Sequence, residues 1–159
     1  MDDITAHSIF QDWLDRVVAC VVANDYATWR TTMDCPLLVD SAMGPSEMRT
    51  EDQLRAKFDR WRLQVAPQRT SDIVRTAHDV RALAPDHIEG AYTMDVRRDG
   101  QEVMPRFISA ATLRLKDGHW RAAELNSGLA VEDCHLIHTP APDDATTDAA
   151  PLPYEGITR

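Results

Sequence analysis

The 159-residue sequence has few of the features that would assign it to a class at once. Its three cysteines, Cys20, Cys35 and Cys134, are odd in number and widely spaced, which argues against a disulfide framework and favours reduced thiols in a cytosol. No apolar run approaches the ~20 residues that cross a bilayer, and the start Met1-Asp2-Asp3 lacks the basic residues of a signal peptide. We therefore expect a cytoplasmic protein without a membrane partner.

Positive charge is also scarce. The sequence has 17 Lys and Arg against 26 Asp and Glu, a formal net charge of -9. Such a surface repels nucleic-acid phosphates and anionic lipids, so neither is expected as a partner. No glycine-rich phosphate loop is found, and no cofactor is expected. The hydrophobic share of 43% is ordinary for a globular domain that builds its own core.

The first third of the sequence predicts two helices. Between Ser8 and Val22 apolar residues recur at intervals of three and four, as one face of an amphipathic helix requires. Asn24 and Asp25 can stop this helix and cap a short second one, which Pro36 prevents from continuing. A pair of packed helices is therefore expected at the N-terminus.

A third helix is predicted after a short extended stretch. Leu37–Val39 reads as a brief strand, and Ser41–Pro45 reads as a loop. Thr50 and Gln53 then have the spacing of a capping box, and the helical repeat that follows runs to Pro67. This helix needs a flat surface on which to pack.

Beyond Thr70 the pattern becomes extended, with many β-branched and aromatic residues. Four strands are predicted, namely Asp72–Ala82, His87–Arg97, Gln101–Leu115 and His119–Leu129. Asp99-Gly100 and Asp117-Gly118 supply the turn residues of tight hairpins, so these strands should pair antiparallel. Helices followed by strands predict an α+β fold, with three N-terminal helices packed on an antiparallel sheet.

The last part of the sequence differs in composition. We expect one domain over residues 1–130 and an extended tail over 131–159, rich in proline, alanine and aspartate, that wraps its own domain or a partner subunit. At its start, Cys134, His135 and His138 suggest a metal cluster, but their spacing completes no tetrahedral zinc set. No metal is therefore expected.

Three segments resemble the nuclear transport factor 2-like superfamily: Asn24–Trp29, Met48–Leu54 and Asp117–Arg121. The resemblance extends over roughly Ile4–Leu129. It implies a cone, in which a strongly curved sheet curls around the helices and leaves an apolar cavity at its open end. Ketosteroid isomerases, scytalone dehydratase, polyketide cyclases and proteins without chemistry share this architecture, so the resemblance leaves the function open.

The leading hypothesis is that the cone binds a small apolar or aromatic molecule without catalysis. The candidate ligand-binding residues are mostly bulky and apolar: Trp13, Val17, Tyr26, Trp29, Phe58, Trp61, Met94, Trp120 and Glu124. The four tryptophans among them also suit a hydrophobic core that fills the cone. A ligand-binding role and a core role therefore both stay open for them.

Glu124 is included because it shares strand parity with Trp120 and Ala122 and should point inward with them. A buried acid needs a partner, and Arg75 or Arg106 can supply one. A structural ion pair is favoured over an anchor for a carboxylate-bearing ligand.

The alternative is a cofactor-independent isomerase, dehydratase or cyclase that uses Asp40 with His78 or Tyr92. The resemblance places Asp40 where ketosteroid isomerases hold their carboxylate base. The positions of their oxyanion-stabilising tyrosine and acid fall near Arg16–Val18 and Ala110–Ala111, which supply neither group.

His78 and Tyr92 are the candidate catalytic residues for a dehydratase or cyclase. His78 shares strand parity with Val74 and Val80, and Tyr92 shares it with Met94, so both are expected to face the apolar side. A satisfied core residue is the competing interpretation for each of them.

The opposite face of the sheet is expected to carry Arg75, Thr93 and Asp95. Members of the superfamily commonly pair through that face, so the resemblance implies a homodimer, and the tail could clasp it. A second alternative function is therefore a non-catalytic dimeric interaction module.

Overall fold

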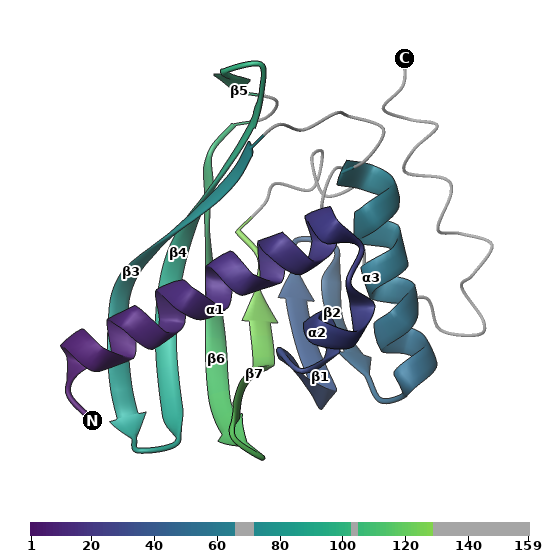
Figure 1. Cartoon of the computed structure of the whole chain (residues 1–159). Helices are drawn as coiled ribbons and strands as arrows, with labels where there is room; N and C mark the ends of the chain where they lie inside the picture. The colour runs from purple at the N-terminus through teal and green to yellow at the C-terminus, as the bar shows by residue number, and fades with distance from the viewer. Residues whose placement is uncertain (66–71, 103–104, 129–159) are drawn as a thin grey trace.

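The computed structural model describes residues 1–65, 72–102 and 105–128. In this part of the chain three helices lie against one face of a curved sheet, as Figure 1 shows. The predicted tail at 131–159, with Cys134, His135 and His138, lies outside the described residues. The predicted boundary after residue 130 is therefore not tested.

The helices begin and end where the local signals place them. Their bounds are Asp3–Ala23 for α1, Tyr26–Arg30 for α2 and Glu51–Val65 for α3. Asn24 adopts a left-handed conformation (φ 57°) that ends α1, and the Asp25 carboxylate accepts a 3.1 Å bond from the Thr28 N–H to begin α2. The Thr50 hydroxyl and the Gln53 amide each accept the other's backbone N–H at 3.2 Å. The predicted capping box is thus confirmed.

The sheet has seven strands in the order β2-β1-β7-β6-β4-β3, with β5 paired to β4. Their bounds are Met33–Ser41 (β1), Gly44–Met48 (β2), Asp72–Ala84 (β3), His87–Arg98 (β4), Gln101–Glu102 (β5), Phe107–Lys116 (β6) and His119–Asn126 (β7). Two expectations need correction. The predicted loop at Ser41–Pro45 is the turn and start of a hairpin, with Gly44 at φ 108°. The sheet is also mixed, because β1 pairs parallel with β7.

The remaining strand pairings are antiparallel, as predicted. Asp99 and Asp117 have φ 52°, and the glycines that follow them have φ 78° and 76°, so both aspartate-glycine pairs form the expected tight turns. The helices cover the inner face of this sheet and enclose one hydrophobic core. The predicted α+β architecture is therefore confirmed.

A bulge in β3 reverses which side chains face the helices. His78 pairs with Ala91 and Arg81 pairs with Glu89, so β3 has one extra residue there, and Asp79 has φ 46°. Before the bulge the odd positions, Arg75 among them, face inward; after it, Val80 does. The expectations that His78 faces inward and that Arg75 faces outward are therefore both wrong.

A second bulge changes the last strand. Thr112 pairs with Glu124 whereas Leu113 pairs with Ala122, so β7 has one extra residue between these pairs. Ala122 is buried and Leu125 packs against the core, which turns Glu124 to the outer face. The inward orientation predicted for Glu124 is wrong for the same reason as that of His78.

The long helices are amphipathic rather than apolar throughout. α1 buries Phe10 and Leu14 on one side and exposes Asp12 and Asp15 on the other. None of the helices in the described ranges combines the length and the apolarity that a membrane crossing requires. The cytoplasmic location stays a prediction.

Candidate functional site

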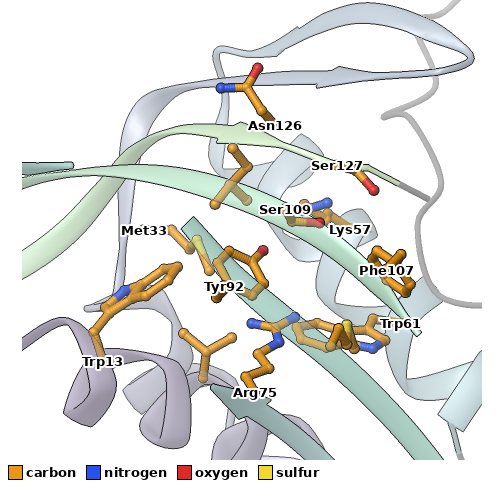
Figure 2. A pocket seen from close by; sticks show the side chains of 13 residues that line it. Trp13, Met33, Lys57, Trp61, Arg75, Tyr92, Phe107, Ser109, Asn126 and Ser127 are labelled. Atoms are coloured by element: carbon orange, nitrogen blue, oxygen red, sulfur yellow. The ribbon is translucent and has the colours of Figure 1, made fainter. Parts of the chain in front are cut away.

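A cavity of about 50 Å³ remains between the sheet and the helices α1 and α3 (Figure 2). This volume has room for roughly three to five waters, whereas pockets for drug-sized ligands measure about 300–1,000 Å³. Its lining is mostly aromatic and aliphatic, with a few polar and two basic side chains: Trp13, Val17, Met33, Lys57, Trp61, Arg75, Tyr92, Met94, Phe107, Ser109, Leu125, Asn126 and Ser127.

The sheet supplies one wall of the cavity as two adjacent rows across β3, β4 and β6. Arg75, Met94 and Phe107 are cross-strand neighbours in the first row. Tyr92 and Ser109 are neighbours in the second. Because successive residues of a strand alternate between faces, these positions point to the same side of the sheet.

The helices supply the opposite wall. Trp13 and Val17 on α1, and Lys57 and Trp61 on α3, are each four residues apart and so share one face of their helix. The Trp13 indole N–H is used internally, because it donates a 3.1 Å bond to the Thr32 carbonyl. The buried Trp61 indole N–H has no partner among the described residues.

Arg75 reaches into the cavity between two aromatic rings. Its guanidinium carbon lies 4.7 Å from the centre of the Trp61 ring and 5.4 Å from that of Tyr92, and Figure 2 shows it between them. Its Nε is buried without a hydrogen-bond partner in the described part of the chain. Burial lowers the pKa of Arg75, although a guanidinium stays charged in proteins.

Lys57 is the second cation of the cavity. Its side chain is 9% exposed, and no ion pair or hydrogen bond to it occurs within the described ranges. Burial, and secondly the positive charge of Arg75, together lower the pKa of Lys57 to about 8. None of the described lining residues carries a carboxylate. The buried charge of Lys57 and the partly buried charge of Arg75 therefore face one small space that none of the described residues neutralises.

The structure places four of the nine predicted ligand-binding residues in this lining: Trp13, Val17, Trp61 and Met94. Tyr26, Trp29 and Phe58 instead pack on one another away from the cavity, with ring centres 5.3 to 5.9 Å apart. Trp120 borders a separate shallow hollow beside α1, and Glu124 lies on the outer face. Trp29 is thus a core residue, as the competing interpretation of the tryptophans predicted, and Tyr26 and Phe58 pack with it.

The three predicted catalytic residues are not brought together. Tyr92 is buried and lines the cavity, whereas Asp40 is exposed on β1 and is absent from the described lining. His78 is exposed on the outer face, where its ring nitrogen lies 2.6 Å from the Thr93 hydroxyl. The geometry therefore assembles no Asp40–His78 or Asp40–Tyr92 pair inside the cone.

Sequence reasoning missed Lys57, and it named Arg75 only as a possible partner of Glu124 and as a residue of the outer face. A signal for Lys57 was present, because it falls on the buried side of α3 with Leu54, Phe58 and Trp61, where a lysine is out of place. Arg75 had no such signal. Its inward direction depends on the bulge after His78, and a one-residue bulge leaves no periodic trace in the sequence.

The outer face has a shallow hollow of its own. Val74 and Ile108 border it and are 49% and 65% exposed. Thr93 and Asp95 lie there as predicted, and Asp95 accepts bonds from Arg97 at 2.9 Å and Arg106 at 3.3 Å. Arg106 is thus paired with Asp95 rather than Glu124. Homodimerisation through this face stays a prediction.

Comparisons with solved structures identify the fold. A nuclear transport factor 2-like protein of unknown function from Shewanella oneidensis superposes with a TM-score of 0.60 at 10% identity, over 76% of this chain and 96% of that one. A domain of unknown function with a cystatin-like fold from Nostoc punctiforme gives 0.56 at 10% identity, over 80% of each chain. A nuclear transport factor 2-like protein from Cytophaga hutchinsonii gives 0.55 at 12% identity, over 77% and 97%.

These similarities show that the chain has the nuclear transport factor 2-like, or cystatin-like, fold. No known family description matches the sequence, and no curated protein matches it. Identities of 10 to 12% carry the fold alone, so the function has to be argued from the cavity.

Proposed function

We propose that this protein binds a small apolar or aromatic molecule in the cavity between the sheet and the helices α1 and α3. The observation that carries the proposal is the cavity itself, which stays hollow although Trp13, Trp61 and Tyr92 converge on it. Protein interiors are close-packed, and a void lined by large rings loses dispersion contacts that a ligand restores.

Methionine side chains give the site room to adapt. Met33 and Met94 both line the cavity, and methionine is unbranched with three rotatable side-chain bonds. A change of rotamer at these positions enlarges the present volume of about 50 Å³ without moving the backbone. A single aromatic ring is therefore a suitable size for the ligand, and a steroid is not.

The alternative enzyme has no comparable support. An isomerase, dehydratase or cyclase using Asp40 with His78 or Tyr92 requires the acid and base to reach the same substrate atoms. Asp40 and His78 are exposed outside the described cavity lining, so only Tyr92 is in position. Binding without catalysis is the function that the geometry favours.

The proposal is tested with indole as the probe and saturation-transfer NMR on the full chain. Ser109→Leu places a larger apolar side chain in the cavity, and Ala110→Leu adds the same side chain on the opposite face of the same strand. We expect indole to bind the unaltered protein and the Ala110→Leu control, and to lose at least tenfold in affinity with Ser109→Leu. Circular dichroism establishes that both variants fold.

Two results would contradict the proposal. Equal indole binding by the folded Ser109→Leu and Ala110→Leu proteins would place the ligand outside the cavity. Absence of saturation transfer to indole in the unaltered protein would show that the cavity does not accept a single aromatic ring.

A further inference from the structure

We infer that the ligand of this cavity is a small organic monocarboxylate, whose carboxylate group binds between the Lys57 ammonium and the Arg75 guanidinium. The inference rests on the proposed binding function and narrows it from apolar molecules in general to those with one negative charge. The inference depends on two basic residues of this chain that the fold alone does not specify.

The first argument is the missing counter-charge. Two other basic side chains of the described ranges are neutralised by acids: Arg30 pairs with Glu51 at 2.6 Å, and Lys116 pairs with Asp34 at 2.5 Å. Lys57 is more buried than either and has no ion pair with any residue that the structure describes. A buried charge without a partner is strongly unfavourable, and a bound anion removes that cost.

The second argument is the set of unused hydrogen-bond donors. Arg75 Nε and Trp61 Nε1 are buried and have no hydrogen-bond partner among the residues of known placement, and Lys57 adds an ammonium group with three donors. Trp29 Nε1 is also unpartnered, but it does not line the cavity. A carboxylate has two oxygens that accept several hydrogen bonds. It therefore matches a site whose unpartnered polar atoms are donors.

The third argument is that Arg75 is held in place before any ligand arrives. Its guanidinium lies against the rings of Trp61 and Tyr92, at 4.7 and 5.4 Å from their centres. Contact with two rings restricts the guanidinium, and a restricted group loses less entropy when it binds a carboxylate. Apolar walls around it suit the hydrocarbon part of the same molecule.

The mainly apolar walls of the cavity favour an organic monocarboxylate over a phosphate. A phosphate monoester has up to two charges and three free oxygens, all of which need donors in a space of about 50 Å³ with mainly apolar walls. A monocarboxylate such as benzoate presents one charge to the two cations and an apolar ring to Met33 and Phe107. Benzoate and phosphate are therefore expected to behave differently in the binding experiment.

The test is isothermal titration calorimetry of the full chain with benzoate, its neutral isostere benzamide, and inorganic phosphate at pH 7. We expect benzoate to bind at least tenfold more tightly than benzamide. Lys57→Met and Arg75→Met should each weaken benzoate binding at least tenfold and change benzamide binding less than threefold. Arg106→Met, on the outer face, is the matched control and should change neither.

The pH dependence gives a second signature. The charged and titratable groups around Lys57 in the cavity are Arg75 on β3 and Tyr92 on β4, and α1 presents only Trp13 and Val17 to it. Loss of the Lys57 proton removes one of the two charges that attract the anion. Benzoate affinity should therefore fall severalfold between pH 7 and pH 9.5, and the Lys57→Met protein should show no such fall.

The possible failures are distinguishable. Equal affinity for benzoate and benzamide, with indole still bound, overturns the carboxylate inference and leaves the proposed function standing. No binding of indole, benzamide or benzoate overturns the proposed function itself. Phosphate that competes with benzoate at equal concentration overturns the choice of a monocarboxylate.

One further variant tests whether the chain supplies its own anion. Glu132 and Asp133 follow the described residues closely. The double variant Glu132→Gln with Asp133→Asn should bind benzoate as the unaltered protein does. An increase of tenfold or more would show that an acid of the chain already occupies the site, and would overturn the inference of a free ligand.

Discussion

The helix α3 borders two groups of aromatic side chains about one turn apart. Phe58 belongs to a filled cluster with Tyr26 and Trp29, whose ring centres are 5.3 to 5.9 Å apart. Trp61 belongs to the group around the cavity. The filled cluster packs like a core, and the second group leaves a hollow, although the ring types are the same.

The position of the neighbouring arginine separates the two groups. Arg55 covers the filled cluster from the solvent side, 4.5 Å from the Tyr26 ring centre, and pairs with Asp59 at 3.2 Å. Arg75 stacks on Trp61 from the inside and has no acidic partner in the described part of the chain. The cation thus lies on the solvent side of the filled cluster and on the inner side of the hollow group, where the proposed ligand would bind.

The largest effect expected from this comparison concerns the two tryptophans. Trp29→Ala should destabilise the protein by about 3–5 kcal/mol, because Trp29 is fully buried among other rings. Trp61→Ala should cost at least ~1 kcal/mol less, because part of the Trp61 ring already faces a void. Urea denaturation of both variants measures the difference. Equal costs would remove the distinction between a filled and a hollow group.

A smaller effect of opposite sign is expected at Lys57. Its pKa is about 8 in the folded protein, against 10.5 as the ordinary value, so the unfolded chain binds more protons between these pH values. Stability should therefore rise from pH 8 to pH 10.5, by up to about 3 kcal/mol. Lys57→Met should abolish this rise and stabilise the protein at pH 7 by about 1–3 kcal/mol.

Denaturation across this pH range checks the prediction with a matched control. The sequence has one other lysine, Lys116, whose ammonium pairs with Asp34 outside the cavity. Lys116→Met should keep the rise in stability above pH 8. A rise of the same size in the Lys57→Met protein would show that Lys57 is not the group responsible.

The smallest effect is expected on the solvent side of the filled cluster. Arg55→Met removes a cation over the Tyr26 ring and an exposed ion pair with Asp59, so it should cost about 0.5–1 kcal/mol. Asp59→Asn removes the ion pair alone and should cost less than half of that. A cost above ~2 kcal/mol for Arg55→Met would mean that the exterior cation is essential to the cluster.

The features that the sequence predicted correctly depend on neighbouring residues. The end of α1 at Asn24, the start of α2 at Asp25, and the capping box of Thr50 and Gln53 each need only a few adjacent side chains. The same holds for the turns at Asp99 and Asp117. Local chemistry of this kind is independent of how the rest of the chain packs.

The features that the sequence did not reveal depend on distant residues. The parallel pairing of β1 with β7 joins segments about 85 positions apart, and periodicity within either strand does not encode it. Both bulges are set by pairing with a neighbouring strand, so the directions of His78, Arg75 and Glu124 were predicted wrongly. The inward position of Arg75 in the candidate site therefore became visible only in three dimensions.

The bulge at Asp79 has a consequence for how this chain and others of its fold could change. Deletion of that single residue would restore regular alternation along β3 and rotate its first half by one position. Arg75 would then turn to solvent, and Val74 and Thr76 would enter the chamber in its place. The deletion of one codon, with no substitution anywhere, would thus leave Lys57 as the remaining cation among the described residues that line the cavity.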